Sequence, residues 1–225
     1  MIKYNELVIS AEKLHIVENI RNITDSAYVL RLKRKDISFR AGNYIVLGIK
    51  NNTLRREYSI YSCEKDDYLE VLIKELPEGD VSKQLKKLQP GDIIHVEGPF
   101  GYFNLSEKNL HAKKHLFIAS GTGISPFHSF VRSYPEIDYT ILHGVRYSDE
   151  AYDFKEYEPS RYILCTSGDS TGTFHGRVTQ YLKENPVNPD IIIYLCGNSN
   201  MIFEAYDILK NQGVPLEKIH TEVYF

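Results

Sequence analysis

Cysteine is scarce in this sequence, and long hydrophobic runs are missing. The 225 residues include three cysteines, Cys63, Cys165 and Cys196, which are far apart and odd in number. Such a set builds no disulfide framework, fits a reducing compartment, and lacks the spacing of a zinc site or an iron–sulfur cluster. The apolar run 191–196 is far shorter than the ~20 residues that cross a bilayer, and the N-terminus has no signal-peptide pattern. We therefore expect a soluble, cytoplasmic protein with no membrane association.

Positive charge is not in excess either. Lysine and arginine number 27 against 30 aspartate and glutamate residues, which gives a net charge of −3. A chain without surplus positive charge is not expected to have nucleic acid as its main partner. The composition is otherwise that of an ordinary globular protein, with 42% hydrophobic and 25% charged residues. The length predicts one large domain or two small ones, with a full hydrophobic core.

The first half of the chain is typical of β-structure. Short segments rich in β-branched residues and tyrosine alternate with turn residues, and they cover 30–33, 44–49, 58–61, 68–74 and 93–97. Apolar residues recur at helical spacing there only in the segment 81–88. This pattern predicts a closed or nearly closed antiparallel β-barrel.

The second half alternates strands with helices. Apolar strand segments at 115–120, 139–145, 161–165 and 191–196 are interleaved with helical patterns at 126–132, 176–184 and 200–211. This βαβ order predicts an α/β domain with a parallel sheet and helices on both of its faces. The change of pattern falls in the polar segment 109–114. We therefore expect two domains, a barrel at 1–109 and an α/β domain at 110–225.

A glycine-rich turn follows the first strand of the second half. The strand leads into Gly121, Thr122 and Gly123, and a helix begins near Ser125 and Pro126. The first glycine allows a tight turn, the second allows a pyrophosphate to approach the backbone, and the helix start offers N–H groups to an anion. Proline suits the first turn of a helix. The short glycine motif alone fits a plain tight turn equally well, but the strand before it and the helix after it favour nucleotide binding.

Several motifs occur in one order along the whole chain. They are Arg56-Glu57-Tyr58-Ser59, Gly79-Asp80-Val81-Ser82, Gly98-Pro99-Phe100-Gly101, the segment 121–126, Cys196-Gly197 and Glu222. In this order the sequence resembles a ferredoxin–NADP reductase-type flavoenzyme, and within that group the stand-alone ferredoxin or flavodoxin–NADP reductases. The resemblance implies an FAD-binding barrel followed by an NADP-binding α/β domain, with FMN as the alternative flavin.

The resemblance implies a role for each motif of the barrel. Arg56 would face the flavin phosphates, with Glu57 beside it in the motif. Tyr58 would lie against the isoalloxazine ring and Ser59 would bond near the flavin N5 atom. The remaining flavin contacts would come from the strand end Leu72, Ile73 and Lys74, and from Gly79, Asp80, Val81 and Ser82 at a helix start. Outside this family context, Tyr58 fits a half-buried strand aromatic and the segment 79–82 fits an ordinary helix cap.

In the α/β domain the resemblance implies a site for nicotinamide. Thr122 would lie between flavin and nicotinamide, within the turn that binds the dinucleotide. Cys196 would line the hydride-transfer site, and Glu222 would orient the nicotinamide or relay a proton. Tyr224 would stack on the flavin and act as a gate. Asn198 and Met201 would flank the nicotinamide ribose, and Phe225 would lie toward the adenine. Outside this family context, Cys196 fits a small buried thiol and Glu222 fits an exposed strand acid. Tyr224 and Phe225 fit a strand end that buries aromatics.

The choice of nicotinamide cofactor depends on basic residues. Arg146 follows the second strand of the α/β domain, where an arginine pairs with a 2′-phosphate, and Arg177 matches a further basic position of the NADP-dependent relatives. Gly168 stands where those relatives carry an arginine. The pattern favours NADPH, with NADH as the alternative.

The electron acceptor is expected to be a separate protein, because the sequence has no cysteine cluster for a fused iron–sulfur domain. The resemblance implies an acidic ferredoxin or flavodoxin as acceptor. A basic docking face for it would include Lys83, Lys86, Lys87, Lys113 and Lys114. The alternative is that these lysines are scattered over the surface. Two other functions stay open at this point. One is an NADH-dependent reductase component that feeds an oxygenase or another iron–sulfur acceptor, and the other is an electron-transfer subunit or nucleotide sensor without turnover.

Overall fold

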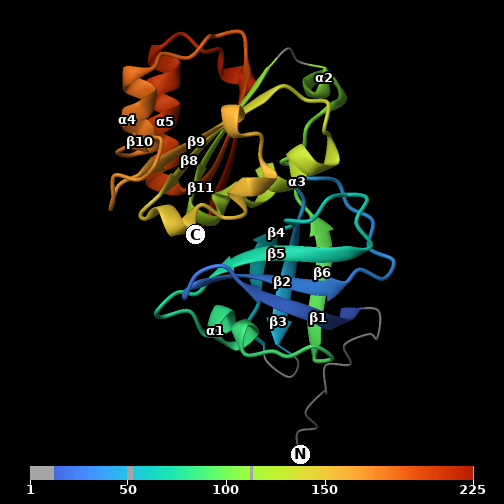
Figure 1. Cartoon of the computed structure of the whole chain (residues 1–225). Coiled ribbons are helices and arrows are strands. Elements are labelled where there is room, and N and C mark those ends of the chain that lie inside the picture. Colours follow the sequence, from blue (N-terminus) through green and yellow to red (C-terminus); the bar gives the residue numbers. More distant parts are fainter. Residues whose placement is uncertain (1–12, 50–52, 112–113, 225) are drawn as a thin grey trace, which may run out of the picture.

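The computed structural model describes residues 13–49, 53–111 and 114–224. Figure 1 shows a β-sheet domain at the bottom and an α/β domain above it, which meet along one face. The expected fold class is therefore confirmed. Within the described residues, no helix is both long enough and apolar enough to span a membrane.

The first domain is a six-stranded antiparallel sheet with the strand order β4-β3-β6-β1-β2-β5. Its strands are β1 (Leu14–Asn22), β2 (Ala27–Lys33), β3 (Tyr44–Ile49), β4 (Arg56–Ser59), β5 (Tyr68–Lys74) and β6 (Ile93–Phe100). An isolated antiparallel bridge between Ile60 and Val71 connects the two edge strands, so the sheet nearly closes on itself. A helix, α1 (Asp80–Lys86), buries Val81 and Leu85 against the barrel core.

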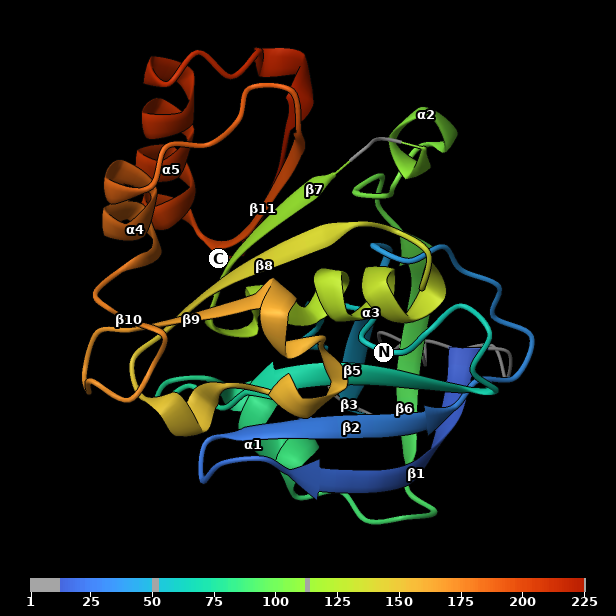
Figure 2. The ribbon, with the colours of Figure 1, turned by 45° about the horizontal axis from the view of Figure 1, so that its top comes forward.

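The second domain is a six-stranded sheet in which every pair is parallel, with the order β10-β9-β8-β7-β11-β12. Its strands are β7 (His115–Ser120), β8 (Tyr139–Val145), β9 (Tyr162–Thr166), β10 (Phe174–His175), β11 (Ile192–Asn198) and β12 (Ile219–Tyr224). The helix α3 (Ser125–Ser133) covers one face of the sheet. The helices α4 (Val178–Glu184) and α5 (Ser199–Asn211) cover the other, as Figure 2 shows.

The helix α3 lies between the two sheets and joins the domains. Its Phe127 and Phe130 belong to one continuous cluster of buried side chains from both domains. The barrel contributes Ala27, Val29, Ala41, Tyr61 and Leu72, and the parallel sheet contributes Phe117, Ala119, Ile141, Tyr194 and Cys196. Because this cluster crosses the boundary, the relative position of the domains is set by a shared hydrophobic core.

The short helix α2 (Glu107–Leu110) lies in the connection between the sheets. The division that we propose, 1–109 and 110–225, falls within it. Three strands of the described residues were not expected from the sequence, β1, β10 and β12. In β1 a register shift between Val17 and Asn19 interrupts the alternation on which a strand prediction depends.

Candidate active site at the domain interface

The sheet of the second domain has its topological switch point between β7 and β11. After β7 the chain passes to α3 on one face, and after β11 it passes to α5 on the opposite face. In open α/β sheets, ligands bind in the crevice beyond the carboxyl ends of such a strand pair. The expected glycine-rich turn at Gly121–Ile124 and the pair Cys196-Gly197 both lie at this edge.

The two glycines of the turn have different roles. Gly121 has a φ of +53°, and a Cβ there would meet no described atom within 4 Å apart from those of the turn itself, so the turn is left-handed and open on that side. A Cβ on Gly123 would lie 2.3 Å from the Cys196 carbonyl oxygen, and one on Gly197 would lie 2.4 Å from Ser120 Oγ. Gly123 and Gly197 therefore allow the ends of β7 and β11 to touch, whether or not a cofactor is bound.

Four residues that the sequence suggested as catalytic meet where β4 of the barrel faces β11 and β12. Tyr224 Oη donates to Ser59 Oγ at 2.6 Å, and Ser59 Oγ donates to Glu222 Oε2 at 3.1 Å. Cys196 Sγ lies 4.0 Å from the same Glu222 oxygen. We call Ser59, Cys196, Glu222 and Tyr224 the interface cluster, because the first comes from one domain and the others from the second.

Burial controls the charge of the interface cluster. Removal from water raises the pKa of Glu222 to about 7, the nearby Glu57 charge adds to this, and the Ser59 hydrogen bond opposes it. Burial, followed by the Glu222 charge, also raises the pKa of the Cys196 thiol well above its usual value. Burial likewise raises the pKa of Tyr224. Near neutral pH the thiol and the phenol are therefore uncharged, and Glu222 is the member that titrates.

The expected flavin residues of β4 lie beside the start of α1. Arg56 is exposed, and the Tyr58 ring is half-buried, which raises the pKa of its phenol to about 12. Tyr28 Oη donates to the Ser82 carbonyl oxygen at 2.6 Å, and the Tyr58 phenol is close enough to raise the pKa of Tyr28 further. The structure thus brings together two motifs that are 20 residues or more apart in the sequence.

The start of α1 can bind an anion through its backbone. Gly79 precedes the helix, and no described side chain caps it, so the N–H groups of Asp80 and Val81 are available to an outside acceptor. The Ser82 hydroxyl is used within the turn, where it donates to the Gly79 carbonyl oxygen at 3.3 Å. Asp80 is exposed in the first turn, and its negative charge would repel an anion that binds close to its side chain. Together with the exposed Arg56 guanidinium, this set of donors fits a flavin nucleotide.

The strand end at Leu72, Ile73 and Lys74 offers mainly its backbone to a ligand. Leu72 and Ile73 are buried in the hydrophobic cores. The Lys74 ammonium pairs with the Glu150 carboxylate of the second domain, and Glu150 Oε2 also accepts from the Arg146 backbone N–H at 3.1 Å. Glu150, which sequence reasoning missed, therefore connects the flavin strand to the turn after β8.

The expected dinucleotide residues occupy the loops at the carboxyl edge of the parallel sheet. Arg146 and Arg177 are both exposed, and the Arg146 guanidinium lies 5.3 Å from the centre of the Tyr147 ring. A Cβ on Gly168 would lie 2.7 Å from that ring and 2.8 Å from the Arg146 carbonyl oxygen. Position 168 is a glycine because the turn at Arg146 and Tyr147 packs against it and leaves no space for a side chain. Asp169 Oδ2 accepts from the Ser148 N–H at 2.8 Å, and such bonds hold its pKa below the usual range.

Three further expected residues serve the fold locally. The Asn198 side chain accepts from the N–H groups of Asn200 and Met201 and so caps α5. Ser125, at the start of α3, donates from Oγ to the Thr122 carbonyl oxygen at 2.7 Å and thereby closes the glycine-rich turn. Pro126 occupies the first turn of α3, as expected. Phe225 and Lys113 lie outside the described residues.

Comparison with known proteins agrees with this arrangement. The model "Oxidoreductase FAD-binding domain" matches residues 13–105, and the model "Oxidoreductase NAD-binding domain" matches residues 117–206. The chain belongs to the ferredoxin–NADP reductase family of flavoenzymes. The two matched models identify an oxidoreductase chain with one FAD-binding and one NAD(P)-binding domain.

Relatives of this flavoenzyme differ in their electron acceptors. The chain is 28% identical to the toluate 1,2-dioxygenase electron transfer component of Pseudomonas putida over 92% of its own length, and it spans 66% of that protein. It is 24% identical to the flavodoxin/ferredoxin–NADP reductase of Escherichia coli, over 83% of this chain and 85% of that one. The crystal structure of a Neisseria gonorrhoeae ferredoxin NADP+ reductase with bound FAD and NADP has the same fold, with a TM-score of 0.85 and 21% identity. The match covers 94% of this chain and 98% of that one.

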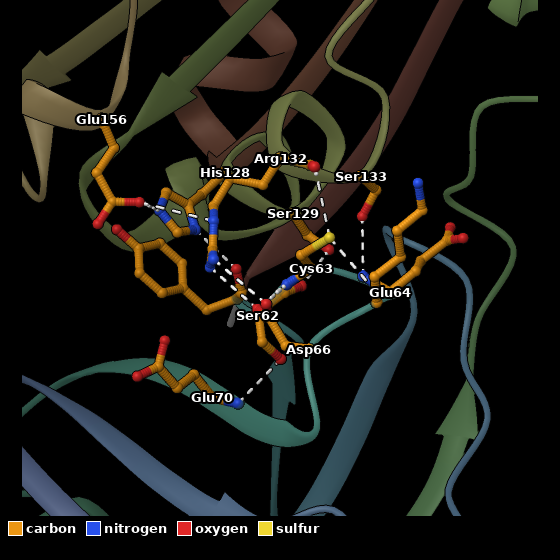
Figure 3. A network of polar contacts seen from close by, with 12 residues as sticks. Ser62, Cys63, Glu64, Asp66, Glu70, His128, Ser129, Arg132, Ser133 and Glu156 are labelled. Carbon is orange, nitrogen blue, oxygen red and sulfur yellow. Dashed lines mark hydrogen bonds and ion pairs between the residues drawn. The ribbon is translucent and has the colours of Figure 1, made fainter.

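A polar network at the domain boundary of the flavoenzyme was not foreseen from its sequence (Figure 3). His128 of α3, which is 1% exposed, contacts the Tyr61 carbonyl oxygen at 2.7 Å and Glu156 Oε2 at 3.1 Å. Its ring stacks on the Tyr61 ring at a centroid distance of 3.7 Å. Ser129 donates to the Ser62 carbonyl oxygen at 2.7 Å. These contacts fix the segment after β4, and with it Ser59, against the second domain.

The same boundary holds an ion pair between the domains. Arg21 of β1 donates two hydrogen bonds to Asp153, at 2.8 and 2.7 Å, and the Tyr61 hydroxyl donates to Asp153 at 3.0 Å. The side chains of His128, Asp153 and Glu156 are close enough to suggest a metal site. Arginine cations already neutralise both carboxylates, because Arg21 pairs with Asp153 and Arg132 pairs with Glu156. We interpret the group as a structural ion-pair network.

The expected lysine docking face is not formed by the described residues. Lys83, Lys86 and Lys87 lie on or next to α1, at the end of the barrel away from the α/β domain (Figure 1). Lys86 pairs with Glu75 at 3.1 Å, which reduces its charge toward a partner. Lys114 directly precedes β7, in the other domain. These lysines are therefore divided between two regions.

Proposed function

We propose that this flavoenzyme transfers a hydride from NADPH to FAD and passes the electrons singly to a ferredoxin or flavodoxin. The observation that carries the proposal is the interface cluster, in which Ser59 of the FAD-binding domain meets Cys196 and Glu222 of the NAD-binding domain. A hydride moves over a short distance only, so its donor and acceptor must lie together at such a boundary. FAD supplies the chemistry that links a two-electron donor to one-electron acceptors.

On the barrel side, the proposed flavin contacts divide into phosphate and ring contacts. Arg56 and the N–H groups at the start of α1 bind the phosphates. The hydroxyl of Ser59, held between Tyr224 and Glu222, presents a hydrogen-bonding group at the reacting edge of the flavin ring. Tyr224, whose hydroxyl donates to Ser59, would shield this edge from water until nicotinamide takes its place.

On the sheet side, Cys196 and Glu222 form the floor of the proposed nicotinamide pocket. Cys196 is fully buried and its thiol is uncharged, so it supplies an apolar surface of fixed shape. Glu222 titrates near pH 7, so it can hold a proton at Oε2 or release it. An ionised Glu222 stabilises the positive charge that the nicotinamide ring gains on losing hydride.

The preference for NADPH rests on two exposed arginines. Arg146 and Arg177 lie after β8 and before α4, at the edge of the sheet where the dinucleotide is expected to bind. A guanidinium pairs with a 2′-phosphate through two hydrogen bonds. Gly168 supplies no third cation, and Asp169 adds a negative charge beside this region. We therefore expect a moderate preference for NADPH.

The choice of a ferredoxin or flavodoxin as acceptor is supported by two relatives of similar length. The chain covers 85% of the flavodoxin/ferredoxin–NADP reductase of Escherichia coli and 90% of the ferredoxin–NADP reductase of Azotobacter vinelandii. A second candidate is a reductase that serves an oxygenase. It is favoured by the 28% identity to the toluate dioxygenase component, of which this chain spans 66%.

The test begins with the purified protein and its extracted flavin. We expect bound FAD, rapid reduction of that FAD by NADPH in a stopped-flow experiment, and turnover with a ferredoxin or flavodoxin as acceptor. A colourless protein that FAD and FMN do not reconstitute would refute flavin binding. A preparation that reduces a Rieske-type oxygenase component faster than ferredoxin and flavodoxin would favour the second candidate.

Cofactor preference is tested at Arg146. We expect Arg146→Ala to lower kcat/KM for NADPH by about tenfold or more and to leave NADH nearly unchanged, because a lost charged hydrogen bond costs roughly 1.5–3 kcal/mol. Arg161→Ala is the matched control, since Arg161 precedes β9 at the opposite edge of the sheet. If the wild type prefers NADH, Arg146 does not bind a 2′-phosphate.

A further inference from the structure

A buried histidine lies directly beneath the glycine-rich turn. His143 of β8 is 0% exposed and pairs in register with Ala119 of β7, next to the turn that begins at Gly121. Its Nε2 atom lies 2.8 Å from the Gly121 carbonyl oxygen, and its Nδ1 atom lies 2.7 Å from Tyr162 Oη. No part of the proposed hydride transfer uses this residue.

The two partners fix the tautomer of His143. A carbonyl oxygen only accepts hydrogen bonds, so Nε2 carries the proton and donates to Gly121. Nδ1 is then the acceptor of the hydrogen bond that the Tyr162 hydroxyl donates. Burial lowers the pKa of His143 to about 4, although the Gly121 contact opposes this, so the ring remains neutral at ordinary pH. The donor to Gly121 is therefore present throughout the physiological range.

The hydrogen bond to Gly121 determines where the next N–H group points. The Gly121–Thr122 peptide is trans, so its C=O and its N–H point in opposite directions. With the carbonyl held inward by His143, the Thr122 N–H points outward. That is the side of the crevice, and the turn is open at Gly121, where a Cβ would meet no described atom within 4 Å apart from those of the turn itself.

We propose that His143 is a positioning residue for the dinucleotide: it holds the Gly121 carbonyl inside the fold and so presents the Thr122 N–H as a donor to bound NADPH. This inference rests on the proposed function, since it assigns the dinucleotide to the same turn. A glycine with a φ of +53° has a wide choice of conformations, and an anchored carbonyl selects one of them before the cofactor arrives. Preorganisation of this kind acts on binding rather than on the chemical step.

The proposal is tested by separating the donor from the bulk of the side chain. His143→Leu removes the donor, whereas His143→Gln restores an N–H at a similar reach. Binding of NADP+ is followed through the change in flavin absorbance, and flavin reduction by NADPH is followed by stopped flow. We expect His143→Leu to raise the dissociation constant about tenfold, which corresponds to ~1.4 kcal/mol. We expect the limiting reduction rate to stay within about threefold of the wild type, and His143→Gln to recover most of the affinity.

His115 supplies a matched control. It is also 0% exposed, and its Nε2 lies 2.8 Å from the Asn109 carbonyl oxygen, but it is at the start of β7, away from the turn. His115→Leu should lower stability and leave NADP+ affinity unchanged. Equal loss of affinity in His115→Leu and His143→Leu would reduce His143 to a general structural role and overturn the proposal. Wild-type affinity in a folded His143→Leu would overturn it as well.

A second measurement applies even if His143→Leu fails to fold. In the FAD-bound wild type, ¹⁵N spectra should show His143 as the neutral Nε2–H tautomer from pH 5 to pH 9. Tyr162→Phe removes the donor to Nδ1, and we expect mixed tautomers and about threefold weaker NADP+ binding. An Nδ1–H tautomer or an imidazolium in the wild type contradicts the proposal. If NADPH does not reduce the wild-type flavin at all, the proposed function fails, and the tautomer still reports on the Gly121 contact.

Discussion

Among single residues, Glu222 links pH to activity most directly. Its pKa of about 7 lies in the range where cells and assays operate. In the proposed mechanism ionised Glu222 stabilises the charge on oxidised nicotinamide, so we expect the limiting rate of flavin reduction by NADPH to rise severalfold between pH 6 and pH 8. Glu222→Gln should give a slower rate that does not change with pH. An unchanged pH profile in Glu222→Gln would show that another group controls the step.

The same ionisation acts on stability in the opposite direction. The pKa of Glu222 is higher in the folded protein than the usual 4.5, so folding takes up a proton. Its stabilising contribution is complete below pH 4.5 and is lost as the pH rises through about 7. Chemical denaturation of the wild type and of Glu222→Gln between pH 5 and pH 8 should therefore show a smaller loss of stability in the variant. Parallel curves would mean that the carboxyl is not buried as described.

Among the strands and helices, the close approach of the turn after β7 to the end of β11 most strongly restricts which residues fit, because it requires a glycine at position 123. Gly123→Ala forces a Cβ against the Cys196 carbonyl, which belongs to a central strand, so we expect a loss of stability of about 1–3 kcal/mol. Gly121→Ala meets no neighbour but is strained by its φ, and Gly121→Asn tolerates that conformation better. Melting temperatures should fall in the order Gly121→Asn, Gly121→Ala, Gly123→Ala, with the last the lowest. A Gly123→Ala variant as stable as the wild type would contradict the close approach.

Local sequence patterns were sufficient for much of the fold. The bounds of β3, β5, β7 and β8 are those expected from β-branched runs and turn residues, because burial on both sides leaves a clear apolar pattern. The strands β1, β10 and β12 were missed. A register shift disturbs β1, β10 has only two residues, and polar residues interrupt β12. The barrel was recognised from many short strands, which is a property of spacing along the chain.

The motifs also named the members of the interface cluster, but not their environment. Each motif is local, whereas the contact between Ser59 and Glu222 joins residues 163 positions apart. The raised pKa of Glu222 follows from burial by both domains. His143, Asp153 and Glu150 carry no motif at all, because their partners are set by tertiary packing, within the α/β domain for His143 and between the domains for Asp153 and Glu150. For His143, the only signal in the sequence was a histidine near the end of an apolar strand segment.

Across the two domains, the pair of Arg21 and Asp153 contributes to alignment. The Asp153 side chain is 14% exposed, so loss of its partner leaves a largely buried charge. We expect Arg21→Ala to destabilise the protein by about 2 kcal/mol, to lower its melting temperature by about 5 °C, and to slow flavin reduction. The control is Lys183→Ala, which breaks an exposed pair with Glu204 inside one domain and should change little. An equal, small effect of both substitutions would show that the hydrophobic core alone aligns the domains.

The separation of Ser59 and Glu222 along the chain has a consequence for biosynthesis. A ribosome adds roughly 5–20 residues per second, so Glu222 emerges roughly ten to thirty seconds after Ser59. The strands β1 to β6 of the barrel all precede residue 101 and are therefore synthesised before or early in that interval, whereas β12 is made last. The barrel side chains that pack against the second domain have no partners until that domain follows. We therefore expect hydride transfer from NADPH to begin only after β12 has joined the sheet.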